Sequence, residues 1–169
     1  MELDRTSNGS GFVALNDLAT IRKLDYGSWM APEFSGLQVP TLREFIGTIC
    51  DLGLNLQLEL KETKGHEHEL VDLVCDELEA HWPADTASKI FISGFSERCL
   101  RRGRERMPKM PLALALACVP RNPDQLAAEA GVQIIHVNDA FVDAEALETI
   151  ATSSVEFGVA TVNDPLRAR

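Results

Sequence analysis

The sequence predicts an α/β protein built on a parallel sheet. Short apolar segments alternate along the chain with segments of helical periodicity, which is the order that a parallel sheet covered by helices requires. Residues 54–61 carry a strict alternation of apolar and polar side chains, the period of a strand. At 169 residues and 45% hydrophobic content, the chain suits one domain with a core of its own. It is short for a complete (β/α)8 barrel, which takes about 250 residues.

The first forty residues are predicted to be irregular apart from one short helix. Asn8-Gly9-Ser10-Gly11 is typical of a turn, because Asn and Gly accept positive φ angles. Asn16-Asp17 is expected to cap a helix that continues to about Leu24. Thr41-Leu42-Arg43-Glu44 has the pattern of a capping box, and it predicts a helix ending near Leu52.

The alternating pattern of residues 54–61 predicts the strand that carries the candidate site residues. Its apolar face is expected to pack beneath helices, so that Gln57, Glu59 and Lys61 point together to the opposite side. In the mouth of a barrel, this carboxylate and this ammonium would seat a metal and a phosphate. The alternative is an exposed antiparallel strand with a cross-strand ion pair.

Four further strands alternate with four further helices. The helices are expected over about 68–81, 96–106, 124–130 and 144–154, and the strands over 89–96, 112–119, 132–137 and 157–162. Because no linker and no low-complexity segment interrupts this repeat, residues 1–169 are expected to form a single domain.

Composition and charge narrow the classes of function. The formal net charge of −10 argues against nucleic acid or an anionic membrane as a partner, and no apolar run is long enough for a membrane span. The basic run over 101–109 is therefore interpreted as a solvated helical face. The four cysteines lack any metal or redox spacing, so we expect reduced, mostly buried thiols in a cytoplasmic protein. His66 and His68 lie about 200° apart on a helix and could not share an ion there.

The order of motifs resembles the glycerophosphodiester phosphodiesterase family over nearly the whole chain. Members carry a strand ending Glu-x-Lys, a later Ser-Phe strand end, and a Thr-Val-Asn-Asp-Pro segment. The matching segments here are Leu58-Glu59-Leu60-Lys61, Ser93-Gly94-Phe95-Ser96 and Thr161 to Pro165. Upstream, Leu3 to Gly11 is similar to the family's Arg-Thr-Thr-Asn-Gly loop. The resemblance implies a TIM (β/α)8-type barrel, which we expect to be incomplete, without its first strands and its closing strand.

Departures from the family pattern shape the expected activity. The family's His-Arg, Glu-x-Asp and His-Asp motifs would precede Met1, so the acid and base histidines and two metal-binding carboxylates have no counterpart in this sequence. Ala160 stands where a Trp is usual, and Gln57 where Asn is common. We therefore expect little or no diesterase activity from the 169-residue chain alone.

The resemblance implies a phosphoric diester hydrolase of lipid and glycerol metabolism. It would hydrolyse a small-molecule glycerophosphodiester to glycerol 3-phosphate and an alcohol with the help of a divalent metal, Mg²⁺ or Ca²⁺. Glu59 maps onto a metal ligand and Lys61 onto a substrate-binding cation, with Phe95 and Asn163 also lining the substrate pocket. His136, near a strand end, is interpreted as a hydrogen-bonded structural residue.

Three interpretations remain open at this point. The chain is a fragment of a cytoplasmic glycerophosphodiester phosphodiesterase, a degenerate non-catalytic barrel that binds a phosphorylated ligand or a protein partner, or a different phosphate-handling barrel enzyme. An incomplete barrel would expose unpaired sheet edges, so we also expect homo-oligomers that form through those edges.

Overall fold

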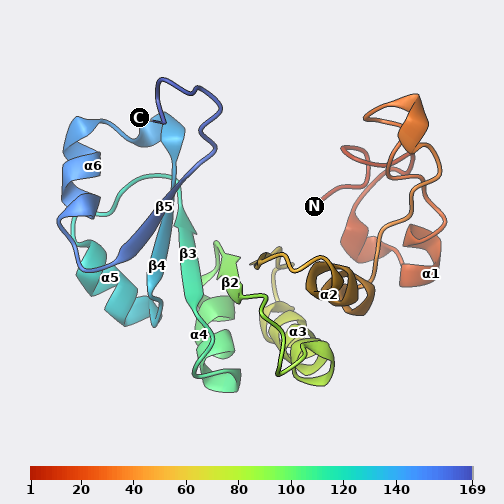
Figure 1. Cartoon of the computed structure of the whole chain (residues 1–169), viewed down its shortest axis with the longest axis horizontal. Helices are drawn as coiled ribbons and strands as arrows, with labels where there is room; N and C mark the ends of the chain where they lie inside the picture. The colour runs from red at the N-terminus through yellow and green to blue at the C-terminus, as the bar shows by residue number, and fades with distance from the viewer. Residues whose placement is uncertain (169) are drawn as a thin grey trace.

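A computed structural model describes residues 1–168 as an α/β fold around one five-stranded sheet (Figure 1). The strands are β1 (Leu56–Leu60), β2 (Ile90–Gly94), β3 (Leu112–Leu116), β4 (Ile134–Asn138) and β5 (Glu156–Ala160). They lie in the order β1-β2-β3-β4-β5, and every neighbouring pair is parallel. The predicted parallel α/β layout is confirmed, and the antiparallel alternative for residues 54–61 is wrong.

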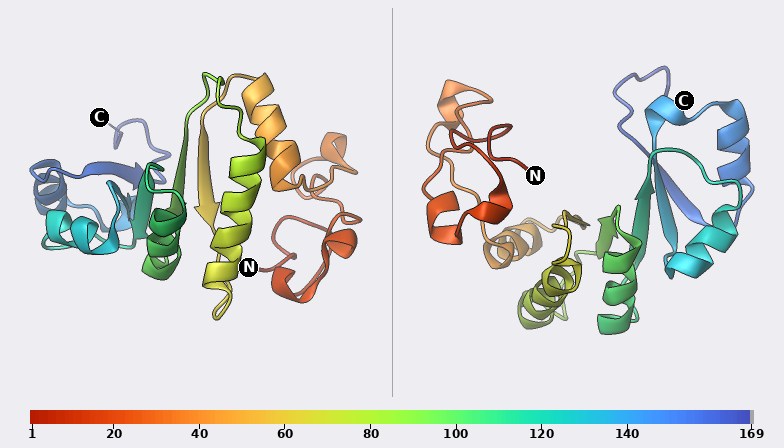
Figure 2. Two further views of the ribbon diagram at one scale, coloured as in Figure 1. Left: turned by 90° about the horizontal axis from the view of Figure 1, so that it is seen from below. Right: turned by 180° about the vertical axis from the view of Figure 1, so that it is seen from behind.

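Six α-helices are present in the described part of the chain: α1 (Leu18–Ile21), α2 (Leu42–Asp51), α3 (Glu67–His81), α4 (Glu97–Arg106), α5 (Pro123–Ala130) and α6 (Ala144–Ala151). Helices α3 to α6 lie along one side of the curved sheet in the views of both Figure 1 and Figure 2. The N-terminal segment lies beyond α2, at the β1 end of the sheet, and the C-terminal loop lies at the β5 end. Within residues 1–168, no helix lies on the opposite face of the sheet, here called the inner face (Figure 2).

The core lies between the helices and the outer face of the sheet. Strand residues pointing outward are buried, among them Leu60, Ile92 and Leu114. They pack against apolar side chains of α3 and α4, such as Val71 and Leu100. Because side chains alternate along a strand, the apolar side chains of β1 face the helices, and Gln57 and Glu59 face the inner side of the sheet. Leu54 departs from the predicted strand over residues 54–61, because it precedes β1 and its side chain is exposed.

Helix starts follow the predicted capping chemistry. The Thr41 hydroxyl accepts a hydrogen bond from the Glu44 amide at 3.3 Å, and the Glu44 carboxylate accepts one from the Thr41 amide at 2.8 Å. Ser96 caps α4 through a single bond, which its hydroxyl accepts from the Cys99 amide. The short helix α1 ends at Ile21, three residues before the predicted end at Leu24.

Helix α4 does not present its basic run only to solvent. Arg102 and Arg106 both donate to the Asp72 carboxylate of α3, at 2.8 and 2.9 Å, and Arg106 also donates to Asp76. These arginines hold the pKa of Asp72 below its ordinary value by hydrogen bonding. The charges therefore join two neighbouring helices, which the sequence alone could not show because the partners lie some thirty residues apart.

The N-terminal segment is ordered around Asp25. The Asp25 carboxylate accepts hydrogen bonds from the amides of Gly27, Ser28 and Gly36, and the Asn8 side chain accepts from the Asp25 amide at 2.9 Å. Gly27 fits this loop because any Cβ atom would overlap the backbone carbonyl of Phe34. The Asp25 carboxylate thus connects both ends of a loop in which few apolar side chains are buried.

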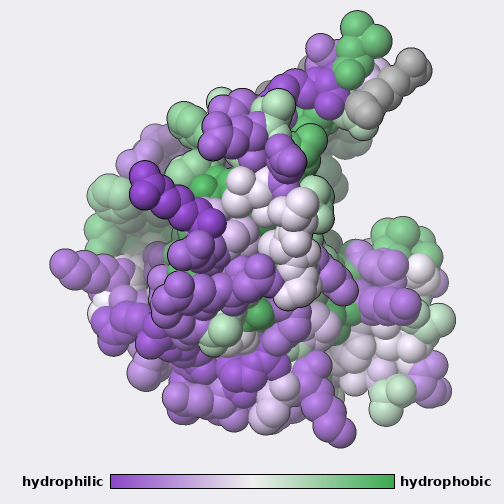
Figure 3. All heavy atoms as spheres, turned by 90° about the vertical axis from the view of Figure 1, so that its left-hand side faces the viewer, coloured by the Kyte–Doolittle hydropathy of each residue, from purple (hydrophilic) through white to green (hydrophobic). Residues whose placement is uncertain are grey.

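The surface is mixed in character. The face towards α5 and α6 shows largely hydrophilic side chains with scattered apolar ones (Figure 3).

Across residues 1–168, the helices all fall short of the length and apolarity that crossing a bilayer would take. Cys75 and Cys99 are buried as predicted, whereas Cys50 is half-buried and Cys118 is exposed, because it lies in the loop after β3.

Candidate functional site

The carboxyl ends of the five parallel strands meet at one edge of the sheet, where β1 presents an ion pair. Lys61 follows the last residue of β1, and its Nζ atom donates to the Glu59 carboxylate. The two side chains are 45% and 36% exposed, so both are within reach of a ligand. A Lys ammonium has three N–H donors, and one bond to Glu59 leaves donors for an anion.

The second strand end adds an aromatic ring to this pair. Phe95 follows β2, and its ring lies 4.9 Å from the Lys61 Nζ atom, within the range of a cation–π contact. Glu59 of β1 pairs in register with Ser93 of β2, so the carboxyl ends of the two strands lie side by side. Sequence positions 34 residues apart are thereby brought into one cluster.

An open groove of about 970 Å³ runs beside this cluster. On one side it is lined by the N-terminal segment, including Phe12, Leu15 and Arg5, and on the other by Lys61 and Phe95. Phe12 and Leu15 are exposed, which makes one wall of the groove apolar. The groove places the loop that resembles the family's Arg-Thr-Thr-Asn-Gly segment opposite the end of β1.

Below the ion pair, the inner face of the sheet carries a hydrogen-bonded group. The Gln57 amide nitrogen lies 3.1 Å from Ser93 Oγ and 3.4 Å from His136 Nδ1. The His136 ring also meets Phe91 edge to face, at 5.7 Å between ring centroids. Burial lowers the pKa of His136 below its ordinary value, and the negative charge of Glu59 opposes that shift. The imidazole is therefore favoured in its neutral form.

Asn163 lies in the segment that follows β5 and is exposed. Among the described residues, no hydrogen bond or ion pair joins it to Glu59, Lys61 or Phe95. The segment is instead held by Arg167, which donates to the Asp139 carboxylate at 2.7 Å and to the Val142 carbonyl at 2.6 Å. The structure thus places Asn163 after the end of β5, as predicted.

A site for a divalent ion would need several oxygen donors close to Glu59. Within residues 1–168, no three His, Cys, Asp or Glu side chains converge in a way that could hold an ion. Glu59 is the carboxylate on the inner face at the end of β1, and Lys61 already engages it. Since Mg²⁺ and Ca²⁺ take six or more oxygen ligands, the described residues alone do not make a site for either ion.

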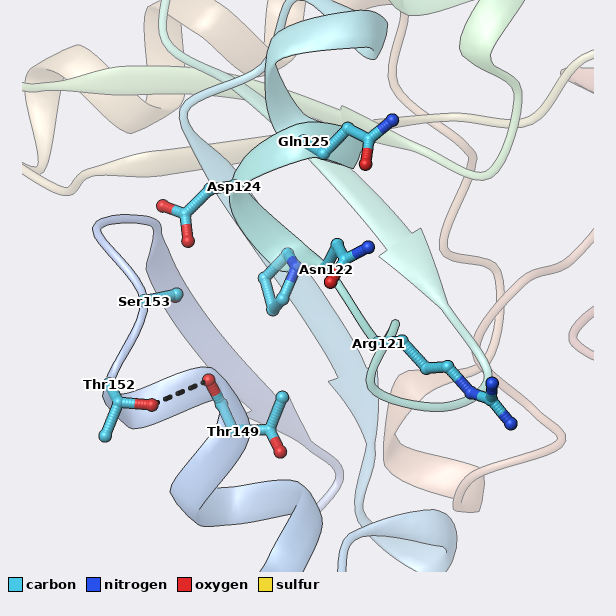
Figure 4. Close-up of a pocket in the computed structure, with 8 residues that line it drawn as sticks. Arg121, Asn122, Asp124, Gln125, Thr149, Thr152 and Ser153 are labelled. Carbon is cyan, nitrogen blue, oxygen red and sulfur yellow. Dashed lines mark hydrogen bonds between the residues drawn. The ribbon is translucent and has the colours of Figure 1, made fainter.

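A second cavity, of about 450 Å³, lies between α5 and the end of α6 (Figure 4). Asp124 there accepts a hydrogen bond from the Ser154 amide at 2.9 Å, and the side chain of Arg121 points away from Asp124. Ser154 leads into β5, so this cavity is at the amino end of that strand. Its polar groups join α5 to the turn before β5, a structural arrangement away from the strand carboxyl ends.

Taken together, a curved parallel sheet with outer helices and a charged cluster at the strand carboxyl ends defines a protein of the (β/α)8-barrel class. The model of the glycerophosphoryl diester phosphodiesterase family matches residues 1–169. The chain belongs to this family.

Curated relatives agree with this membership. The chain is 33% identical over 124 residues to a glycerophosphodiester phosphodiesterase of Bacillus subtilis, covering 65% of this chain and 41% of the relative. It is 28% identical over 138 residues to a glycerophosphodiester phosphodiesterase of Caldanaerobacter subterraneus, covering 79% of this chain and 54% of the relative. The chain thus spans about half the length of the curated relatives it matches.

Solved structures show the same fold. A phosphodiesterase of Oleispira antarctica, in complex with the product sn-glycerol-3-phosphate, matches with a TM-score of 0.92 and 28% identity, covering 99% of this chain and 67% of that one. A glycerophosphodiester phosphodiesterase of Agrobacterium tumefaciens matches in fold with a TM-score of 0.73 and 22% identity, covering 98% of this chain and 67% of that one. The predicted partial (β/α)8-type barrel is confirmed.

Sequence reasoning missed two parts of this site. Ser93 and Gln57 were not expected to bond each other, although both point to the inner face by alternation. His136 is hydrogen-bonded, as predicted, but its partner on β1 is not predicted, because the reach to Gln57 depends on the curvature of the sheet. Alternation within β1 and β4 could have placed these side chains on the inner face, but not in contact.

Proposed function

We propose that this chain provides the phosphate-binding end of a glycerophosphodiester phosphodiesterase, which hydrolyses a glycerophosphodiester to glycerol 3-phosphate and an alcohol. The observation that carries the proposal is the Glu59–Lys61 pair at the end of β1, beside Phe95. Support comes from the family match and from the similarity to a phosphodiesterase that binds glycerol 3-phosphate.

In this proposal each side chain has one role. Lys61 donates N–H bonds to the non-bridging phosphate oxygens and offsets their charge. Phe95 packs against the carbon atoms of the glycerol and keeps water from the ammonium. Asn163 would line the opposite side of the pocket once a ligand bridges it to Lys61.

Glu59 is proposed as one oxygen ligand of a divalent ion, Mg²⁺ or Ca²⁺. When bound, such an ion would polarise the phosphoryl group. Because the described residues do not supply the other protein ligands, we expect the 169-residue chain alone to bind ligand with little or no turnover. Metal-dependent release of glycerol 3-phosphate from sn-glycero-3-phosphocholine by the purified chain would contradict this expectation.

A binding experiment tests the phosphate site directly. We would titrate glycerol 3-phosphate into the ¹⁵N-labelled chain and follow the amide resonances, with glycerol as the control ligand that lacks the phosphate. The expected shifts cluster at Lys61, Glu62 and Phe95 for glycerol 3-phosphate and are missing for glycerol. Shifts confined to residues away from the strand carboxyl ends would refute the site. Binding at this cluster by a full-length relative that shows no turnover would favour the non-catalytic barrel.

Further proposals concern the setting of the protein. We propose a cytoplasmic protein of lipid and glycerol metabolism, supported by the absence of disulfide bonds among the four cysteines. We also propose homo-oligomers, because β1 and β5 are the two edges of the described sheet and each offers unpaired backbone groups. Sedimentation at several concentrations tests the second proposal, and a constant monomer mass would refute it.

A further inference from the structure

We propose that His136 is a positioning residue that fixes strand β1, and with it the Glu59–Lys61 pair, through the side chain of Gln57. The contact spans the inner face from β4 to β1, which are separated by two strands in the sheet. Its consequence for ligand binding rests on the proposed function, whereas its effect on the position of Lys61 does not.

In the described sheet, strand β1 is supported by a neighbouring strand on one side only. Its backbone forms a ladder with β2 on that side. The Gln57 amide adds two connections on the inner face, to Ser93 Oγ at 3.1 Å and to His136 Nδ1 at 3.4 Å. With two N–H groups, one amide nitrogen can donate to both acceptors. The edge strand is thereby tied to β2 and β4 through side chains.

Small residues make room for the imidazole to reach across. Ala113 and Ala115 occupy the inner face of β3, between the strands that are joined. On the other side, Gly158 of β5 pairs with His136, and a Cβ atom there would lie 2.9 Å from Cδ2 and 3.1 Å from Nε2 of the ring. Together with the edge-to-face contact of Phe91, these neighbours hold the ring in one orientation.

The ties to Gln57 act on Glu59 through the geometry of the strand. Glu59 is the next residue on the same face of β1, and its register partner is Ser93, which accepts from Gln57. Any rotation or shift of β1 that breaks the Gln57 contacts would also redirect Glu59. Lys61, which donates to Glu59 and lies over Phe95, would follow it.

The test follows the Lys61 ε-methylene resonances by NMR, because the nearby Phe95 ring shifts them upfield. In His136→Phe, which keeps an aromatic ring but loses the acceptor, we expect these resonances to move towards random-coil values. His136→Gln restores an acceptor oxygen and should return them towards the wild-type position. Unchanged Lys61 resonances in a folded His136→Phe protein would overturn the proposal.

A second variant leaves the chemistry of His136 intact. Gly158→Ala should displace the ring and shift the Lys61 resonances as His136→Phe does. Gly103→Ala is the matched control, since a Cβ atom there meets only the Leu112 side chain at an ordinary 3.7 Å. Equal Lys61 resonances in the two alanine variants would overturn the proposal.

Glycerol 3-phosphate separates this inference from the proposed function. If the wild-type chain binds it, His136→Phe should weaken binding several-fold and His136→Gln should recover it. If the wild-type chain does not bind it but the Lys61 resonances still move, the positioning role stands and the proposed function falls.

Discussion

The Nζ atom of Lys61 lies 4.9 Å from the centroid of the Phe95 ring, while the same ammonium is bonded to Glu59. The contact joins the carboxyl ends of β1 and β2 above the inner face of the sheet. An ammonium that is held by a carboxylate and covered by a ring loses little conformational freedom when an anion arrives. This relationship makes Lys61 the cation on which the first prediction depends.

Replacement of Lys61 by Gln should weaken glycerol 3-phosphate binding by roughly tenfold or more, because a charge-assisted hydrogen bond contributes about 1.5–3 kcal/mol. Calorimetric titration measures the dissociation constant. Lys64→Gln, in the exposed loop after β1, is the matched control and should bind as the wild type does. Equal affinities for the two variants would remove Lys61 from the site.

Stability should depend on pH through His136. Burial lowers the pKa of the folded imidazole, so the unfolded chain binds its proton more readily. The neutral His136 imidazole therefore makes its full contribution to the free energy of unfolding above the unfolded pKa of about 6.5. This contribution is lost as pH falls from there towards the lower pKa of the folded protein. Urea unfolding of wild type and His136→Gln at several pH values measures the difference. If both proteins show the same pH dependence, His136 is not the group responsible.

Helix α3 offers a test of the core with an internal control. Leu78 is 2% exposed and belongs to the core cluster, whereas Leu73 on the same helix is 59% exposed. Leu78→Ala should lower the free energy of unfolding by about 2–5 kcal/mol through lost burial and a cavity. Leu73→Ala should change it by about 0.5 kcal/mol or less. Similar losses for both would mean that the α3 face packed on the sheet has been misassigned.

The N-terminal segment should loosen in acid because of Asp25. Hydrogen bonds from the Ser28 hydroxyl and from the amides of Gly27 and Gly36 hold the pKa of this carboxyl well below its usual range. The order they provide is present above the unfolded pKa of about 3.9 and is lost as pH falls through the lower folded value. Hydrogen exchange at Gly27 and Gly36 measures this loss.

Asp25→Asn should speed exchange at these glycines already at neutral pH, because a neutral amide oxygen accepts more weakly than a carboxylate. Asp51→Asn, at the exposed end of α2, is the control and should leave their exchange unchanged. Protection of Gly27 and Gly36 that persists in Asp25→Asn would show that other contacts order the loop.

The sequence by itself determined the order of the elements and the direction of the key side chains. Alternation in residues 54–61 has one physical consequence in a strand, which is that Gln57 and Glu59 leave the face that Leu60 buries. Capping at Thr41 is equally local, since its hydroxyl accepts a hydrogen bond from the amide three residues ahead. These predictions held because the interactions behind them lie within one turn or one strand.

Only the tertiary structure decided which distant residues touch. The reach of His136 to Gln57 depends on the curvature of the sheet and on small residues at Ala115 and Gly158. The pairing of Arg106 with Asp72 depends on how α4 packs on α3, and the position of the segment after β5 depends on the contact of Arg167 with Asp139. Each of these contacts joins residues at least 25 positions apart in the chain, where the spatial distance is set by packing and not by local sequence pattern.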